Sequence, residues 1–172
     1  KELSATSEHT WALLLALRRK LYHAYQDVTQ GNWRREKFRG NELASNTLGI
    51  LGVGRLGRKV ASYGRAFGMN IIAYEINPKK IPKYIKLVSS LKDLIKQSDI
   101  ISIHIHISNE NYKIFSKELL SHLKPNAIII NTARGELIDE VELVNILKNK
   151  KIGGYAGDVV ENELNIEKSP LQ

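Results

Sequence analysis

Three glycines, Gly52, Gly54 and Gly57, follow a short apolar run at residues 48–51 and open a helical pattern over residues 56–67. In a GxGxxG motif the first glycine permits a tight turn, the second lets a ligand approach the backbone, and the third lets the helix pack close to the sheet. The motif is a weak signal alone, but a predicted strand before it and a predicted helix after it are the context that it requires. The chain is therefore expected to contain a strand–turn–helix unit of an α/β sheet.

Short apolar runs alternate with amphipathic helical patterns along the rest of the chain. Ser90 with Asp93, and Asp139 with Glu142, show the spacing of helix N-caps. This alternation is typical of βαβ units, so we predict an α/β protein with a three-layer Rossmann fold and a doubly wound, mostly parallel six-stranded sheet. Ligands of such sheets bind outside the carboxyl ends of the strands. Further strands are predicted at residues 70–74, 86–88, 99–104, 127–131 and 154–158, and helices at residues 90–97, 111–123 and 139–149.

The segment before the glycine loop is predicted to form one long helix over residues 6–28, which Gly31 and Asn32 break. A connecting loop is expected over residues 33–46, where no periodicity is visible. Because the chain begins with Lys and stops at Gln172 within an apparent loop, we expect it to be a piece of a longer protein.

The composition excludes several classes of protein. The net charge of +8 comes from scattered Lys and Arg residues, which indicates a solvated surface, and no nucleic-acid-binding motif is present. The chain has no cysteine, so it has neither disulfides nor a thiolate metal site, and this fits a reducing cytoplasm. No apolar run reaches the length of a membrane span. We expect a cytoplasmic protein that binds no nucleic acid, no membrane and no metal.

Glu75 ends the second predicted strand, 18 residues beyond the last glycine of the motif. A carboxylate at this place accepts hydrogen bonds from the adenosine ribose and repels a 2′-phosphate, which favours NAD (or NADH) over NADP. The helix after the glycines offers free N–H groups and a positive dipole end to the pyrophosphate. Arg55 either adds a charge-assisted contact or is a solvated loop residue, and the sequence leaves both open.

Three charged residues follow the last two predicted strands. Arg134 comes after the fifth strand, where a guanidinium can bind a planar carboxylate with two hydrogen bonds. Asp158 ends the sixth strand and can accept a hydrogen bond from a nicotinamide carboxamide. Glu163 lies in the next loop, where a carboxylate can orient a catalytic histidine. Any one of these residues could be an ordinary surface charge. Their shared placement after successive strands favours a common binding site.

With these motifs the chain resembles the cofactor domain of the D-isomer-specific 2-hydroxyacid dehydrogenases, a family that includes phosphoglycerate, glycerate, lactate and formate dehydrogenases. The most specific match is the run NTARGELIDE at residues 131–140. Further matches are the helix SEHTWALLLA at residues 7–16, the strand that ends in His104, and Asp158 and Glu163 at the family's spacing from Arg134. The resemblance covers nearly the whole chain.

The resemblance implies a role for each matching residue. Arg134 would bind the carboxylate and carbonyl of the substrate, and Glu163 would pair with the catalytic histidine and raise its pKa. The residues that would bind the cofactor are the glycine loop (Gly52, Gly54, Arg55, Leu56 and Gly57), Glu75 at the ribose, and His104, Thr132, Ala133 and Asp158 near the nicotinamide. The implied reaction is hydride transfer between NAD and a D-2-hydroxy acid or its 2-oxo acid, in a homodimer whose interface contains the helix over residues 7–28. Packing of that helix within a longer monomer is the alternative.

The chain also departs from the family. His106 stands where the family often has proline, and Leu164 stands where proline commonly follows the Glu. All five histidines precede Glu163, so none matches the family's catalytic histidine, and for His104 and His106 a structural role is favoured. We expect residues 1–172 to form the NAD-binding domain alone, without the substrate domain, able to bind NAD but not to use it. The alternatives are an NAD-sensing module like a corepressor, and a formate- or phosphite-type dehydrogenase.

Overall fold

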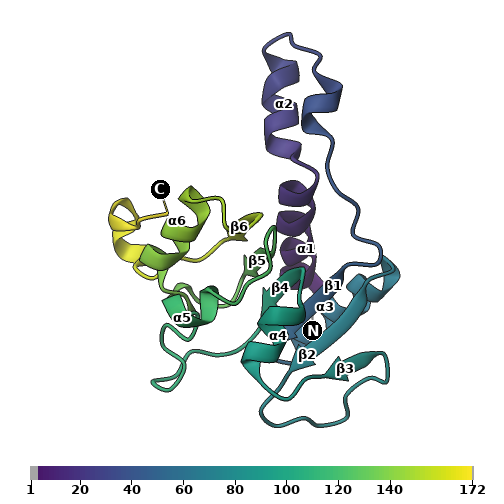
Figure 1. Cartoon of the computed structure of the whole chain (residues 1–172), viewed down its shortest axis with the longest axis vertical. Coiled ribbons are helices and arrows are strands. Elements are labelled where there is room, and N and C mark those ends of the chain that lie inside the picture. Colours follow the sequence, from purple (N-terminus) through teal and green to yellow (C-terminus); the bar gives the residue numbers. More distant parts are fainter. Residues whose placement is uncertain (1–3, 172) are drawn as a thin grey trace.

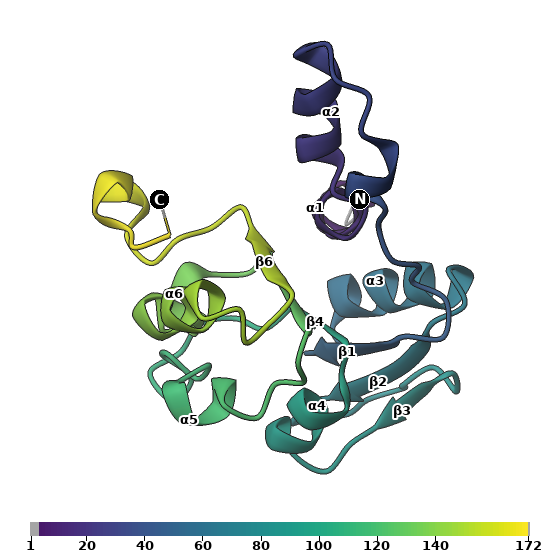
Figure 2. The ribbon, with the colours of Figure 1, turned by 45° about the horizontal axis from the view of Figure 1, so that its top comes forward.

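The computed structural model describes residues 4–171, which form a six-stranded, fully parallel sheet with helices on both faces (Figures 1 and 2). The strand order is β3-β2-β1-β4-β5-β6, so the direction of winding reverses between β1 and β4. The predicted Rossmann fold is confirmed. The strands are β1 (Thr47–Leu51), β2 (Asn70–Tyr74), β3 (Ile85–Leu87), β4 (Ile100–Ile103), β5 (Ile128–Asn131) and β6 (Gly154–Gly157).

The inner strands are mostly apolar because both faces of the sheet are covered. All four residues of β4 and all four of β5 are buried, and neighbouring isoleucines point into different cores. One core lies beneath α1 and α3, and the other beneath α4, α5 and α6. The helices are α1 (Ser4–Arg18), α2 (Leu21–Thr29), α3 (Arg55–Ala66), α4 (Leu91–Gln97), α5 (Lys117–Leu120) and α6 (Glu140–Lys148), with 3-10 helices η1 (Arg35–Phe38), η2 (Gly135–Leu137) and η3 (Glu163–Lys168).

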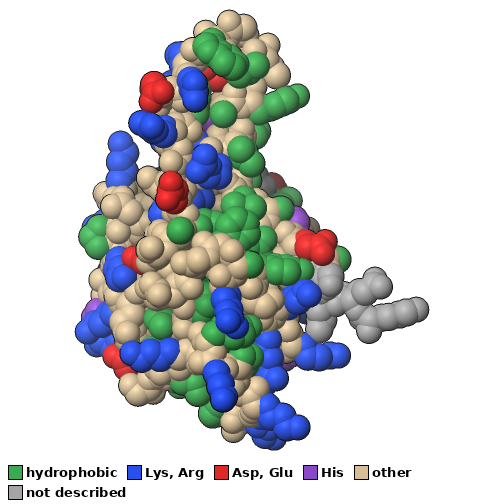
Figure 3. All heavy atoms as spheres, turned by 90° about the vertical axis from the view of Figure 1, so that its right-hand side faces the viewer, with side chains coloured by type: hydrophobic (Ala, Val, Ile, Leu, Met, Phe, Trp, Pro, Cys, Tyr) green, Lys and Arg blue, Asp and Glu red, His purple; other side chains and the backbone are tan. Residues whose placement is uncertain are grey.

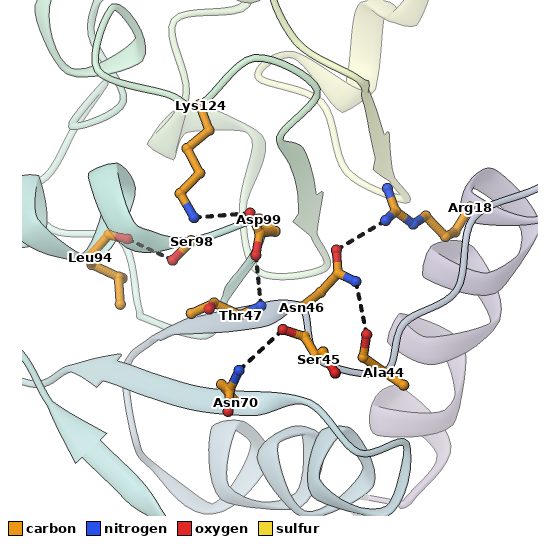
Figure 4. Close-up of polar contacts among 10 residues, drawn as sticks. All are labelled: Arg18, Ala44, Ser45, Asn46, Thr47, Asn70, Leu94, Ser98, Asp99 and Lys124. Atoms are coloured by element: carbon orange, nitrogen blue, oxygen red, sulfur yellow. Dashed lines mark hydrogen bonds and ion pairs between the residues drawn. The ribbon is translucent and has the colours of Figure 1, made fainter.

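Both predicted helix caps are confirmed. The Ser90 hydroxyl accepts a hydrogen bond from the Asp93 N–H at 3.0 Å, and the Asp139 carboxylate accepts one from the Glu142 N–H at 3.3 Å. At the edge of the sheet where the parallel strands begin, Asp99 accepts a hydrogen bond from the Thr47 N–H and forms an ion pair with Lys124 (Figure 4). The two caps fix where α4 and α6 begin, and the hydrogen bond between Thr47 and Asp99 helps to align β1 with β4.

The prediction of one helix over residues 6–28 is wrong, because the chain forms two helices that meet at Lys20. Lys20 has a φ of 53°, in the left-handed region, which ends α1 and turns the chain into α2. The returning loop lies against this turn: a Cβ on Gly40 would lie 2.6 Å from the Arg18 carbonyl oxygen. Helix α2 and η1 project away from the sheet, and we call them the arm (Figures 1 and 2). The loop predicted over residues 33–46 is irregular except for η1.

The prediction of a helix over residues 111–123 is also wrong in extent, since only α5 is α-helical there. The backbone of Phe115 pairs with a distant segment instead, donating to the Leu137 carbonyl at 3.0 Å and accepting from the Asp139 N–H at 3.2 Å. Lys113, with a φ of 48°, donates its N–H to the Glu136 carbonyl. These long-range hydrogen bonds replace the first turns of the predicted helix.

None of the helices in the described part of the chain is long and apolar enough to cross a membrane. Among residues 4–171, no group of three or more His, Asp and Glu side chains is placed to hold a metal ion.

Candidate functional site

The glycine loop connects β1 to α3 at the carboxyl edge of the sheet, beside the point where the strand order reverses. Gly52 has a φ of 90°, and a Cβ there would lie 2.6 Å from the His104 carbonyl oxygen. A Cβ on Gly57 would lie only 2.0 Å from the Gly52 carbonyl oxygen. The fold itself therefore requires glycine at both positions. Gly52 has a positive φ and lies against the backbone of His104, whereas Gly57 lies where α3 packs against the loop.

Gly54 differs from the other two glycines. Its φ is −69°, which any residue adopts, and a Cβ there would meet no atom within 4 Å. No packing contact within the described chain explains a glycine here, whereas a ligand that approaches the backbone does. Gly54 is also the N-cap of α3, and no side chain caps this helix. The loop therefore offers both the room and the free N–H groups that a pyrophosphate needs.

Two side chains that bind Val53 stabilise the shape of the loop. The Glu75 carboxylate accepts the Val53 N–H at 2.8 Å, and its second oxygen accepts the Asn77 N–H at 3.0 Å. The Arg58 guanidinium donates to the Val53 carbonyl at 2.9 Å and also binds the Lys79 carbonyl. Glu75 thus lies at the glycine loop, as predicted, and each of its oxygens keeps a lone pair for a ribose hydroxyl. Sequence reasoning missed Arg58.

A cavity of about 260 Å³ lies between the glycine loop and the carboxyl ends of β4 and β5. It brings together seven residues that the sequence predicted for the site, from three separate segments of the chain. Ile105 and His106 complete its wall. The predicted residues are Gly54, Arg55, Leu56, His104, Thr132, Ala133 and Arg134.

The turn that carries Arg134 is held by Asn131, the last residue of β5, which is fully buried. The Asn131 side chain accepts the Ala133 N–H at 3.0 Å and donates to the Arg134 carbonyl at 2.8 Å. The exposed Arg134 guanidinium donates to the Ala133 carbonyl at 2.6 Å and lines the cavity. Its planar fork is therefore placed where a carboxylate can bind.

His104 forms the cavity wall at the end of β4. Its Nε2 lies 2.8 Å from the Ser102 hydroxyl, while its Nδ1 is buried without a hydrogen-bond partner among the described residues. Burial lowers the pKa of His104 to about 4, so the ring is neutral at physiological pH. An enclosed, unpaired ring nitrogen in a binding cavity fits a residue that contacts a ligand.

Acid titration of His104 is expected to destabilise the fold. Because the folded-state pKa lies below the unfolded value near 6.5, the unfolded chain takes up the proton first, and stability falls as the pH drops from about 6.5 towards 4. The loss should reach up to about 3 kcal/mol at the low end of this range. Urea denaturation of the wild type and of His104→Gln between pH 7 and 4.5 checks this. An equal pH dependence in both proteins would contradict it.

Helix α1 supplies two polar contacts at the carboxyl edge that sequence reasoning missed. The Thr10 and Thr132 hydroxyls lie 2.9 Å apart, and His9 Nε2 lies 3.3 Å from a carboxylate oxygen of Asp158. The buried Trp11 donates to the Val60 carbonyl, which fixes α1 against α3. Asp158 is therefore held at the end of β6 near the turn that contains Thr132. The only signal for these contacts in the sequence is the SEHT run at residues 7–10.

The structure does not bring Glu163 into the cavity. Glu163 is exposed at the start of η3, and it is not among the residues that line the cavity. The next residue, Leu164, is 95% exposed. Glu163 therefore lies at the surface, outside the cavity.

Comparison with known proteins identifies the family. Residues 11–172 match the family model for the D-isomer specific 2-hydroxyacid dehydrogenase, NAD binding domain. A D-3-phosphoglycerate dehydrogenase from Methanocaldococcus jannaschii is 40% identical over 162 residues, which is 92% of this chain and 31% of that protein.

Solved structures with the same fold include the following two. A D-lactate dehydrogenase from Aquifex aeolicus, complexed with NAD and lactic acid, superposes with a TM-score of 0.89 at 32% identity, over 97% of this chain and 51% of that one. An acyclic imino acid reductase in complex with NADPH and D-Arg gives a TM-score of 0.87 at 36% identity, over 94% and 52% of the two chains.

The chain spans 31% and 50% of the length of the first two relatives that it matches. The matched region contains the whole glycine loop, the cavity and the Arg134 turn. The chain belongs to the D-isomer specific 2-hydroxyacid dehydrogenase family, of which it is the NAD-binding domain.

Proposed function

We propose that the protein transfers a hydride between NAD and a D-2-hydroxy acid or its 2-oxo acid, and that this chain supplies the cofactor domain. The observation that carries the proposal is the single cavity that joins the glycine loop, His104 and the Arg134 turn at the switch point of the sheet. It pairs a site for a pyrophosphate with a guanidinium for a carboxylate.

Each residue has a distinct part in the proposed reaction. Arg134 binds the substrate carboxylate and orients the carbon that exchanges the hydride. Thr132, Ala133 and Asp158 orient the nicotinamide, which supplies or accepts the hydride when the cofactor is bound. In oxidation, the hydroxyl proton goes to a histidine from another part of the protein, and Glu163 orients that histidine. Leu56, in the first turn of α3, contributes its backbone N–H to the pyrophosphate.

We place the substrate pocket and the catalytic histidine in a second domain outside residues 1–172. The lengths of the relatives support this, because this chain matches half or less of them. The exposed apolar side chains of Leu164 and Ile166, on the segment that carries Glu163, support it too. An assay of the full-length protein against a panel of 2-oxo acids with NADH tests the proposed function, and no turnover with any of them would refute it.

NAD rather than NADP is the proposed cofactor because of Glu75. Its carboxylate lies at the glycine loop, where it would repel a 2′-phosphate. The relatives include both an NAD complex and an NADPH complex, so this preference belongs to the individual protein.

Removing the charge of Glu75 is expected to relax cofactor selection. Glu75→Gln keeps an acceptor for the Val53 N–H but removes the repulsion, so the preference for NADH over NADPH should shrink by about tenfold or more. Fluorescence titration of both cofactors measures the ratio. Equal binding of NADPH and NADH by the wild type would contradict the role given to Glu75.

We also propose a homodimer that forms through the arm. Hydrophobic side chains gather on this projecting part of the molecule (Figure 3). Asp27 is buried and binds Arg34, which holds α2 against η1 and keeps the arm in shape. Packing of the arm against a second domain of the same protein is the alternative. The large apolar residues exposed on or beside the arm are Leu21, Tyr22, Tyr25, Val28 and Trp33.

A charged residue introduced into this apolar surface is expected to distinguish a homodimer from packing of the arm against a second domain of the same protein. Trp33 is 81% exposed, so Trp33→Asp should leave the fold intact and shift a dimer to monomer. Analytical ultracentrifugation of the full-length protein measures the change. A wild type that is monomeric at all concentrations would rule out the dimer.

The other candidate functions are an NAD-sensing corepressor-like module and a formate- or phosphite-type dehydrogenase. The presence of Arg134 in the cavity favours a 2-hydroxyacid dehydrogenase over a non-catalytic NAD-sensing module.

A cytoplasmic location is also proposed, and the complete lack of cysteine supports it. Cell fractionation tests the location.

A further inference from the structure

Glu140 is a buried carboxylate to which the proposed reaction gives no part. It is the first residue of α6 and is only 3% exposed. One of its oxygens accepts the Glu161 N–H at 2.7 Å, and the other accepts the Ser169 hydroxyl at 2.9 Å. Glu161 and Ser169 lie on either side of η3, so Glu140 binds both ends of the segment that begins with Glu163.

The chain between Arg134 and Glu140 also contacts the residues just before Glu163. A Cβ on Gly135 would lie 2.0 Å from the carbonyl carbon of Val160, so the two backbones touch directly. The side chain of Glu161 forms an ion pair with Lys113 at 3.2 Å, and the Lys113 N–H binds the Glu136 carbonyl. The residues immediately after Arg134 thus form the surface on which the Glu163 segment lies.

The surroundings of Glu140 indicate that it positions the segment that carries Glu163 rather than that it adds to the stability of the fold. No Lys, Arg or His among residues 4–171 forms an ion pair with it. Its carboxyl oxygens accept two hydrogen bonds from neutral groups, and it lies at the N-terminus of α6. An apolar side chain of similar size would be buried here at a lower cost in desolvation free energy. A carboxylate accepts hydrogen bonds from two separate points of a loop at once, which an apolar side chain cannot do.

We propose that Glu140 is a positioning residue, which fixes the segment that carries Glu163 against the turn that carries Arg134. The role in catalysis rests on the proposed function of Glu163, whereas the fixing of the segment does not. Glu140 therefore sets the distance between Arg134, which binds the substrate, and Glu163, which orients the catalytic histidine.

The first test measures the segment itself. Glu140→Ala in the full-length protein is expected to speed hydrogen exchange over residues 159–169 by about tenfold or more, and to leave NADH affinity within about twofold. Glu140→Gln keeps an acceptor for the Glu161 N–H and a donor for Ser169, so it should restore most of the protection. Glu142→Ala is the matched control, because Glu142 lies in the same turn of α6 but pairs with Lys117. Should Glu140→Ala not fold, Ser169→Ala removes one of the two hydrogen bonds and leaves α6 unaltered.

The second test measures the reaction. Reduction of a 2-oxo acid needs a protonated histidine, so its rate falls as the pH rises past the pKa of that histidine. A correctly placed Glu163 raises this pKa, and its displacement moves the fall in rate to lower pH. Glu140→Ala and Glu163→Gln should shift the profile in the same direction, and the double variant should shift it no further than Glu163→Gln alone. A purely structural role would lower the amount of active protein without shifting the profile.

The outcomes separate the two claims. Unchanged exchange over residues 159–169 in Glu140→Ala, or in Ser169→Ala, would overturn the proposal whether or not the protein turns over a 2-oxo acid. Faster exchange together with no turnover in the wild type would refute the proposed function and leave the fixing of the segment established. Faster exchange with an additive shift in the double variant would overturn the link to Glu163.

Discussion

Gly54→Val is expected to raise the dissociation constant for NADH by about 100-fold, which is roughly 2.7 kcal/mol, without lowering the melting temperature. The structure explains both halves of this result. A Cβ on Gly54 would meet no protein atom within 4 Å and its φ is −69°, so the folded chain accommodates the side chain. The same side chain would occupy the space that a pyrophosphate needs above the N-terminus of α3.

Gly57→Ala provides the contrast to this variant. Its Cβ would lie 2.0 Å from the Gly52 carbonyl oxygen, so α3 would have to move away from the loop. This variant should lower the melting temperature and NADH affinity together. Fluorescence titration and thermal denaturation of both variants measure the two properties. Normal NADH binding by Gly54→Val would mean that the pyrophosphate does not lie on this loop.

Arg134→Gln is expected to lower kcat/KM for a 2-oxo acid by about 10²–10³-fold in the full-length protein, since a charge-assisted, two-point contact with the carboxylate is lost. The turn should keep its shape, because Asn131 holds it through the backbone of Ala133 and Arg134 rather than through the guanidinium. NADH affinity should therefore change little. Arg134→Lys should be impaired almost as strongly, because an ammonium group cannot form the planar fork.

Steady-state kinetics with varied 2-oxo acid, together with NADH titration of the same variants, measure these effects. Glu136→Gln is a suitable control, because Glu136 lies two residues further on and takes part in the fold through its backbone carbonyl. Retention of most of the kcat/KM by Arg134→Gln would mean that another group binds the carboxylate.

The parts of the fold that depend on local sequence were predictable. β2 begins and ends at the predicted residues, and the caps of α4 and α6 involve residues only three positions apart. The two wrong helices failed for a different reason. The break at Lys20 depends on the loop that returns to Arg18, and the loss of helix before α5 depends on the pairing of Phe115 with Ile138. Neither contact is visible in the periodicity of the segment that it changes.

The site residues also fall into two groups, those that local motifs predict and those that depend on tertiary packing. Seven of the nine residues that line the cavity were predicted because each stands in a short motif at the end of a strand, where the architecture of a parallel sheet brings them together. Arg58, His9 and Thr10 were missed because their partners are chosen by tertiary packing, as the contact between Thr10 and Thr132, 122 residues apart, illustrates. His106 was expected to have a structural role, but it is exposed at the cavity wall rather than packed in a core.

The most direct test of the central claim is a crystal structure of this chain with NADH. The pyrophosphate is predicted to lie over Gly54 and the first turn of α3, the adenosine ribose at Glu75, and the nicotinamide between His104 and the turn that contains Thr132. A dinucleotide bound in this way at the carboxyl edge of β1 and β4 would confirm the account. Binding at another place, or no binding at NADH concentrations up to about 1 mM, would contradict it.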